Sequence, residues 1–234
     1  MNVTSLVRQR VAAITLVCTT VVAIAPTAEA APLTYDFTGT GGFFGGSTLN
    51  TTETFFDSTG SVSIGATGLN TQSTTDPYLH QNNAGLGVRS SFFDGTQADN
   101  TGDDEAIIFD FGTASTFRFD LISLSEASFD DEYQILGSND AAIFGCSTGL
   151  TCLTGSSSLL ASGSGTGVAG DIDVLLGAQG FQYLVATTPG GSGDAFRVSG
   201  LEATPVAGGG GQSIPVPARD RKSTRLNSSH YRTS

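Results

Sequence analysis

The sequence contains no tryptophan, one methionine, three cysteines and two histidines among 234 residues. Two of its 22 acidic residues, Glu29 and Asp220, lie outside residues 31–218, which leaves 20 within that segment. The only basic residues of the same segment, out of ten in the whole chain, are Arg89, Arg118 and Arg197. The segment therefore has no lysine and a formal charge of −17. Because phosphate binding needs lysine or arginine, we expect no nucleic-acid partner.

The residues that usually perform general acid–base catalysis are scarce. His80 is the only histidine between residues 31 and 218, and no Gly-x-Ser-x-Gly nucleophile motif is present. Carboxylates are so numerous that any pair of them is uninformative about glycoside hydrolysis. We expect a non-enzymatic protein without a catalytic residue. The alternative, a hydrolase, requires His80 or a carboxylate pair in a cleft.

Two of the three cysteines stand close together in the sequence GCSTGLTC. Cys146 and Cys152 are an even pair, and such a pair in an exported protein is typical of a disulfide around a short loop. A zinc site would need further soft ligands, and no histidine lies nearby. We expect a disulfide between these two residues.

The first thirty residues have the pattern of a secretory signal peptide. Arg8 and Arg10 precede the apolar run VAAITLVCTTVVAIA at residues 11–25, and the small residues Ala28 and Ala30 follow it. The run is short for a membrane-spanning helix, and the alternative is a buried helix. We expect residues 1–30 to be removed after Ala30 and the rest of the chain to be exported.

Hydrophobic residues alternate with a period of two, and no long segment has helical spacing. Residues 31–204 are predicted to form one all-β domain, a two-sheet antiparallel β-sandwich of the jelly-roll or galactose-binding-like type. Residues 205–213 are predicted to be a glycine-rich linker. The predicted strands cover residues 33–37, 61–67, 105–111, 116–124, 131–140, 171–176, 181–188 and 194–206.

Two of these strands carry further predictions. Residues 105–111 are apolar enough to lie centrally in a sheet, and with residues 116–124 they form a predicted antiparallel hairpin. Within the second strand, alternation from Phe117 would place Leu121 and Ser123 on the same face as Phe117, and Ile122 on the opposite face.

The densest group of polar residues precedes the strand at residues 105–111. Oxygen atoms from such a loop can supply the ligands that calcium takes, although the spacing does not fit an EF-hand. The alternative is a solvated acidic loop, and a second acidic group at residues 126–132 need not lie close to it. The predicted calcium ligands are Asp94, Asp99, Asp103, Asp104 and Glu105.

The sequence IPVPA at residues 214–218 resembles the start of a PEP-CTERM sorting signal of the Val-Pro-x-Pro-Ala type. The matching residues are Pro215, Val216, Pro217 and Ala218. The stretch at residues 85–112 is similar to one that recurs in exoproteins with this signal, and residues 133–140 are similar to a strand and turn of galactose-binding-like jelly rolls. The resemblance implies export by a Gram-negative bacterium, processing by an exosortase, and a place on the cell surface or in an extracellular polysaccharide matrix.

Residues 219–234 depart from that family, because no hydrophobic helix follows Ala218. The eleven residues DRKSTRLNSSH at 220–230 match an in-frame translation of a common sequencing adapter. We expect this tail to be an artefact and the native membrane anchor to have been lost by truncation; the alternative is a natural basic tail. The sequence thus predicts an exported surface or matrix protein, with a calcium-dependent carbohydrate-binding module as the alternative function.

Overall fold

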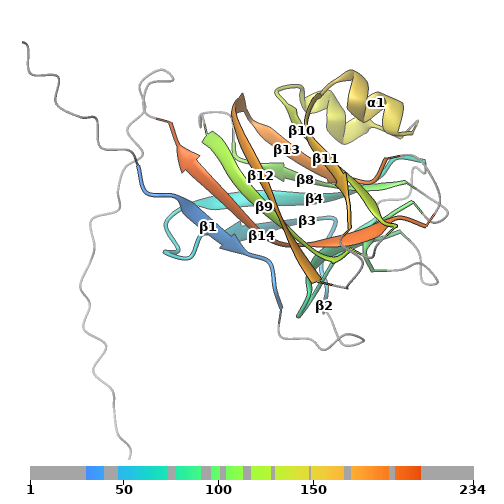
Figure 1. Cartoon of the computed structure of the whole chain (residues 1–234), viewed down its shortest axis with the longest axis horizontal. Coiled ribbons are helices and arrows are strands. Elements are labelled where there is room, and N and C mark those ends of the chain that lie inside the picture. Colours follow the sequence, from blue (N-terminus) through green and yellow to red (C-terminus); the bar gives the residue numbers. More distant parts are fainter. Residues whose placement is uncertain are drawn as a thin grey trace, which may run out of the picture.

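The computed structural model describes most of the segment between the two ends of the chain (Figure 1). The described residues are 30–39, 47–72, 77–90, 96–100, 104–112, 117–127, 130–147, 149–165, 170–189 and 193–206. Residues 1–29 of the predicted signal peptide, the sorting motif and the tail at 219–234 lie outside them, as do Asp94 and Asp103. No helix in the described part is long and apolar enough to cross a membrane.

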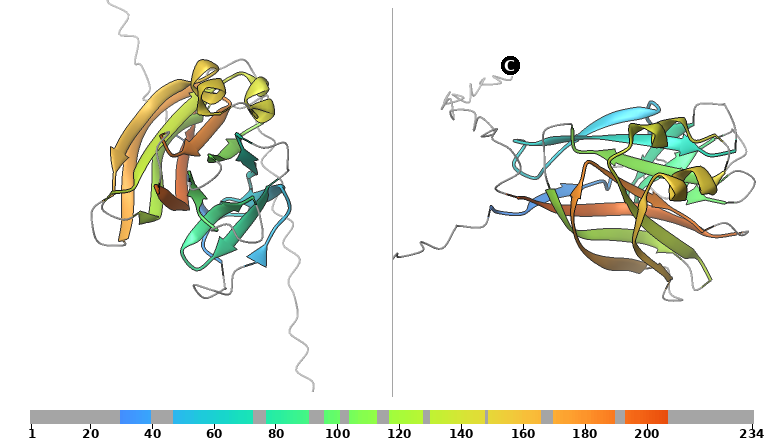
Figure 2. Two further views of the ribbon diagram at one scale, coloured as in Figure 1. Left: turned by 90° about the vertical axis from the view of Figure 1, so that its right-hand side faces the viewer. Right: turned by 90° about the horizontal axis from the view of Figure 1, so that it is seen from above.

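Two antiparallel sheets pack face to face, which confirms the predicted all-β sandwich. The right-hand view in Figure 2 shows the two layers, with β3 and β4 in one and β1 and β14 in the other. The larger sheet has the order β12-β9-β14-β6-β5-β2, and β1 and β7 also pair with β14. Its strands are β1 (Leu33–Asp36), β2 (Ser47–Thr48), β5 (Tyr78–Asn82), β6 (Gly85–Arg89), β7 (Ala98–Asp99), β9 (Phe117–Ala127), β12 (Gly170–Phe181) and β14 (Ala195–Pro205).

The smaller sheet has six strands in the order β11-β10-β13-β8-β4-β3. They are β3 (Thr52–Phe56), β4 (Ser63–Asn70), β8 (Glu105–Asp110), β10 (Glu132–Ser138), β11 (Ser158–Ser164) and β13 (Tyr183–Thr187). All eight predicted strands are present in the two sheets. The strands that the pattern did not resolve are β2, β3, β5, β6, β7 and β11.

The predicted hairpin between residues 105–111 and 116–124 is wrong. β8 pairs with β13 and β4 in the smaller sheet, whereas β9 pairs with β12 and β14 in the larger one. The chain therefore crosses from one layer to the other between these strands. The prediction that β8 lies centrally is confirmed, since it has a partner on both sides.

The predicted faces of β9 are also wrong from Leu121 onward. Phe119 and Ile122 are both fully buried, while Leu121 and Ser123 are only partly buried. In the pairing of β9 with β14, Leu121 lies opposite Glu202 and Phe119 lies opposite Ala203. The chain thus advances two residues along β9 for one residue along β14. This β-bulge moves the side chains after it to the opposite face.

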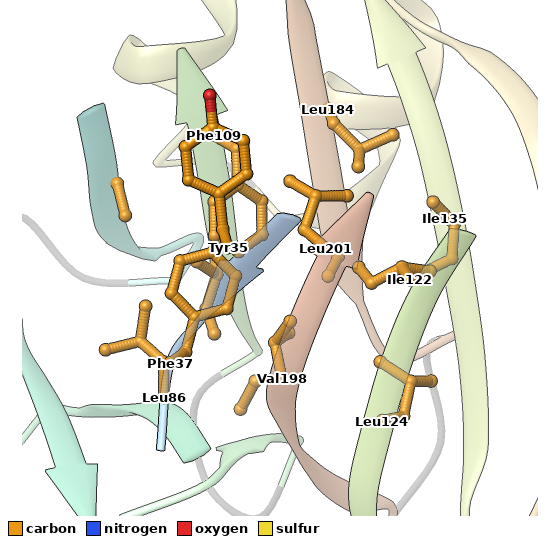
Figure 3. Packing of buried hydrophobic residues seen from close by; sticks show 14 of the residues in the cluster. Tyr35, Phe37, Leu86, Phe109, Ile122, Leu124, Ile135, Leu184, Val198 and Leu201 are labelled. Carbon is orange, nitrogen blue, oxygen red and sulfur yellow. The ribbon is translucent and has the colours of Figure 1, made fainter. Parts of the chain in front are cut away.

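The main core lies between the sheets and is dominated by aromatic and branched aliphatic side chains (Figure 3). Phe37 stacks on Phe109 with ring centroids 5.1 Å apart, so the two aromatic rings join the layers. Val198 and Leu201 of β14 are buried in the same cluster. Val198 and Leu201 are three positions apart, and the register shift between Val198 and Gly200 in the pairing with β9 places both side chains in the core.

A second, smaller core lies on the outer face of the six-stranded sheet, beneath a cap. We call "the cap" the 3₁₀ helix η1 (Ala141–Gly145) together with the α-helix α1 (Leu150–Gly155), which follows it. Ile143 and Leu153 of the cap are fully buried against Ala106, Ile108 and Val185 of the sheet. The sequence pattern did not predict these two short helices.

The disulfide between Cys146 and Cys152 is present, with Cα atoms 5.5 Å apart. It joins the end of η1 to α1 and so closes the cap on itself. A hydrogen bond also attaches this region to the sandwich. The backbone N–H of Gly149, which directly precedes α1, donates to the carbonyl of Thr71 at 2.6 Å. The Asp140 carboxylate accepts from the backbone N–H of Ala142 at 2.9 Å and caps the start of η1.

Candidate ligand-binding site

A cleft of about 490 Å³ lies where the cap meets the six-stranded sheet. This volume is in the range of sites that take small organic ligands. β3, β4 and β8 form its floor, and the end of η1 with the following residues forms a wall. The lining residues are Thr51, Thr52, Gly65, Thr67, Gly68, Leu69, Asn70, Pro77, Asp110, Phe144, Gly145, Cys146 and Ser147.

The strand alternation explains why this floor is polar. Ile64 and Ala66 of β4 point into the main core, so Gly65 and Thr67 face outward. The hydroxyls of Thr52 and Thr67 lie 3.0 Å apart and hydrogen-bond across the strand pair. Gly65 has no side chain, which leaves the floor of the cleft open beside these hydroxyls.

An aromatic ring stands on the cap side of the cleft. Phe144 packs edge-on against Tyr183, with ring centroids 5.2 Å apart and an interplanar angle of 88°. Tyr183 is buried under the cap, and this burial raises the pKa of its hydroxyl, as do the nearby carboxylates of Asp110 and Asp140. The tyrosine therefore stays neutral, and its ring supports the phenylalanine that lines the cleft.

Asp110 is the only ionisable side chain among the described residues that line the cleft. Its Oδ1 accepts from the backbone N–H of Gly112 at 2.7 Å and from Nε2 of Gln182 at 3.4 Å. The same Nε2 donates to the hydroxyl oxygen of Tyr183 at 2.9 Å. A hydroxylated ligand would meet a carboxylate, threonine hydroxyls and a phenyl ring, which is the chemistry that suits a sugar.

The described residues do not assemble the predicted calcium site. No set of three or more histidine, cysteine, aspartate or glutamate side chains within them gathers closely enough to hold a metal ion. Asp99 is buried on β7, and Glu105 is buried at the start of β8, where it accepts from the hydroxyl of Ser90. The carbonyl of Asp104 accepts from the backbone N–H and the hydroxyl of Thr71 at 2.8 and 2.9 Å. Since two of the five proposed ligands lie outside the described residues, the calcium site stays a prediction.

Asp194 joins the two acidic segments at residues 94–105 and 126–132, which the sequence did not require to lie close together. Its Oδ2 accepts from Nδ2 of Asn100 at 2.8 Å, and its Oδ1 accepts from the backbone N–H of Glu132 at 3.0 Å. Asp131 in turn accepts from the backbone N–H of Ala195 at 3.1 Å. The sequence reasoning missed Asp194, although its place between a glycine-rich turn and a strand is one that favours such turn-closing hydrogen bonds.

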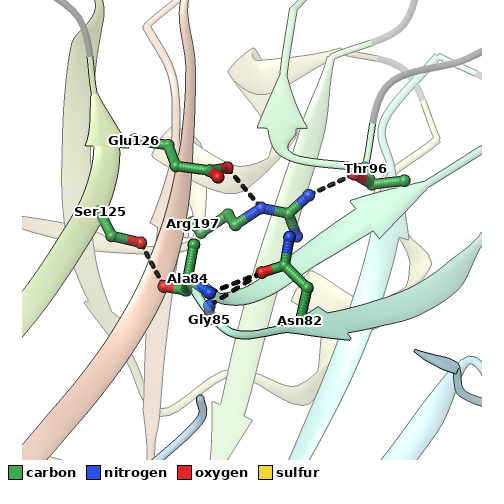
Figure 4. A network of polar contacts seen from close by, with 7 residues as sticks. All are labelled: Asn82, Ala84, Gly85, Thr96, Ser125, Glu126 and Arg197. Carbon is green, nitrogen blue, oxygen red and sulfur yellow. Dashed lines mark hydrogen bonds and ion pairs between the residues drawn. The ribbon is translucent and has the colours of Figure 1, made fainter. Parts of the chain in front are cut away.

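A buried polar cluster lies on the outer face of the larger sheet, away from the cleft (Figure 4). Arg197, which is 1% exposed, donates from Nε to Oε2 of Glu126 at 2.6 Å and from Nη2 to the hydroxyl of Thr96. Burial lowers the pKa of the guanidinium, and the Glu126 carboxylate opposes that change. A side chain at Gly87 would meet the carbonyl of Thr96, so the backbone at Thr96 packs directly on β6 beside this cluster.

His80 lies on β5 and does not line the cleft. Burial lowers its pKa, and the positive charges of Arg197 and Arg89 add to that effect, so the imidazole is neutral at pH 7. Its Nδ1 has no hydrogen-bond partner within the described residues. The cleft beside the cap therefore does not supply the His80 site that the hydrolase alternative requires.

No family model matches the chain, and no curated protein matches it. Among solved structures, it is similar to chitosan-binding module 1 derived from a chitosanase/glucanase of Paenibacillus sp. IK-5. The two chains are 17% identical, the match covers 61% of this chain and 96% of that module, and the TM-score is 0.32. A similarity this distant carries no argument about the ligand, so the case for a function depends on the cleft.

Proposed function

We propose that this chain is an exported, non-enzymatic β-sandwich protein that binds a polysaccharide in the cleft beside the cap. The observation that carries the proposal is the lining of the cleft, where Asp110, Thr52 and Thr67 offer hydrogen-bonding oxygens next to the ring of Phe144. Sugars present alternating hydroxyl groups and apolar C–H faces, and such a lining is complementary to both. With one carboxylate and no histidine, the described lining lacks the pair of acids that glycoside hydrolysis uses.

The place of action in this proposal is the cell surface or the extracellular matrix. It rests on the predicted signal peptide and on the Pro215–Ala218 motif, whose resemblance implies an exosortase and a neighbouring polysaccharide. That polysaccharide would then be the ligand of the cleft. Expression in a Gram-negative host followed by mass spectrometry checks the first step, because the exported chain should begin at Ala31. A chain retained with residues 1–30 attached would remove the export proposal.

Binding to immobilised polysaccharides tests the cleft directly. We expect the full chain to be retained on at least one glycan, and Phe144→Ala to lose retention because the apolar face of the sugar loses its ring. Phe56→Ala is the matched control, since Phe56 is 61% exposed on β3 and does not line the cleft. Failure to retain any glycan, or an equal loss in both variants, would sink the proposal.

A further inference from the structure

The carboxylate of Asp110 is held by hydrogen bonds to one of its two oxygens. Within the described residues its hydrogen-bond donors are Gly112 and Gln182, and both contact Oδ1. Among the described residues, no hydrogen bond to Oδ2 is present, and Asp110 lines the cleft, so Oδ2 is the oxygen left to accept from a ligand. A carboxylate oxygen accepts hydrogen bonds and donates none, so it requires a donor from the ligand.

Gln182 holds this arrangement because its own backbone is fixed at both ends. Its N–H donates to Oδ1 of Asn139 at 2.7 Å, and its carbonyl accepts from the backbone N–H of Phe111 at 3.2 Å. The side-chain amide is then placed between Asp110 and Tyr183, to which its Nε2 donates. The orientation of the Asp110 carboxylate is thus set before any ligand arrives.

The described residues that line the cleft include no arginine, lysine or histidine whose positive charge could offset that carboxylate. Of the three arginines between residues 31 and 218, none lines the cleft: Arg197 is buried against Glu126, Arg118 pairs with Asp120, and Arg89 ends β6 of the larger sheet. The segment as a whole carries a charge of −17, which adds a long-range repulsion of anions. A carboxylate or sulfate on a ligand would meet both the local and the long-range field.

We propose that Asp110 is the specificity-determining residue of the cleft, selecting non-anionic polysaccharides whose hydroxyl groups donate to its Oδ2 and rejecting uronate or sulfated chains. Gln182 is the positioning residue that aims this carboxylate. The inference rests on the proposed polysaccharide-binding function and adds the class of polysaccharide to it. The selection arises from a single carboxylate in a described lining that contains no arginine, lysine or histidine.

Calorimetric titration with two oligosaccharides of equal length, a neutral glucan and an oligouronate, tests the proposal. We expect the full chain to bind the neutral chain at least ten-fold more tightly, with the difference shrinking as salt screens the field. Asp110→Asn should weaken neutral binding by about ten-fold and reduce the discrimination. Asp171→Asn, an exposed change of the same charge on β12, should alter neither. Gln182→Leu should reduce the discrimination while the melting temperature stays near that of the parent chain.

The outcomes separate the two proposals. If the oligouronate binds as tightly as the neutral chain, or if Asp110→Asn leaves the preference intact, the selectivity proposal is overturned while polysaccharide binding stands. If neither oligosaccharide nor any immobilised glycan binds, both proposals fall. A loss of discrimination in Asp171→Asn equal to that in Asp110→Asn would assign the effect to net charge and overturn the role of Asp110.

Discussion

Nε of Arg197 donates to Oε2 of Glu126 over 2.6 Å, and this ion pair joins β14 to β9 with only 2% of the arginine side chain exposed. Glu126 has a φ of 58°, and it is the only residue other than glycine in the described part with a positive φ. The backbone therefore adopts an unfavourable conformation at the residue that neutralises the buried cation. Loss of Glu126 would leave the buried Arg197 charge without compensation, and loss of Arg197 would leave the partly buried Glu126 carboxylate without its partner.

Replacing Arg197 by methionine is predicted to lower the free energy of unfolding by about 3 kcal/mol, because it leaves Glu126 without its partner. The matched control is Arg118→Met, which breaks a surface pair with Asp120 whose side chains are 38% and 22% exposed. Exposed pairs contribute less than about 1 kcal/mol, so the control should lose little. Urea unfolding of both variants measures the difference. Equal losses would show that burial adds nothing to the Arg197 pair.

The sandwich could be predicted from the sequence where the hydrophobic pattern was strong. For β8, this pattern predicted the central position in the sheet correctly and the pairing partner wrongly. Its apolar residues on both faces predicted a central strand correctly, since Ile107 packs in the main core and Ile108 packs under the cap. The strand to which it pairs is decided by contacts far away in the sequence, with β13 and β4. A short connection to β9 therefore suggested a hairpin that the structure does not contain.

Breaking the bond between Cys146 and Cys152 is predicted to destabilise the cap and the cleft together. A disulfide of such short loop length stabilises by about 2 kcal/mol through the unfolded chain. The paired replacement Cys146→Ser with Cys152→Ser should therefore lower the urea midpoint and weaken glycan retention, since Cys146 lines the cleft. Reduction of the parent chain with dithiothreitol should do the same, and it should have no further effect on the paired variant. An unchanged midpoint and retention would contradict the prediction.

The candidate cleft was not predictable from the sequence, and its residues explain why. Asp110 alternates with Phe109 and Phe111, so its outward orientation followed from the pattern. Its neighbours in the cleft come from β3 and from the cap, which are brought together by strand pairing and by the disulfide. The high density of acidic residues instead favoured a calcium site at residues 94–105. In that segment the Glu105 carboxylate accepts from Ser90, and the backbone carbonyl of Asp104 accepts from Thr71.

Calcium remains predicted to bind the segment that contains Asp99, Asp104 and Glu105, with Asp94 and Asp103 completing the ligands. A cation bound only by the folded chain raises the melting temperature. We therefore expect millimolar calcium to raise it, EDTA to reverse the effect, and Asp104→Asn to abolish it, while magnesium has less effect. Differential scanning calorimetry measures these changes. If calcium leaves the melting temperature of the parent chain unchanged, the calcium site and the calcium-dependent form of carbohydrate binding are both removed.

Asp57 is predicted to make stability depend on pH in the acid range. Burial acts to raise its pKa, but hydrogen bonds from Thr59, Ser61 and Val62 outweigh that effect and lower the pKa below 3.8. A lowered folded pKa gives stability that is present above the unfolded value and lost as pH falls through the folded one. Asp57→Asn should therefore cost about 2 kcal/mol at neutral pH, and the difference from the parent should shrink below about pH 4. Urea unfolding across this range checks it, with exposed Asp171→Asn as control; a constant difference at every pH would exclude the carboxylate as its cause.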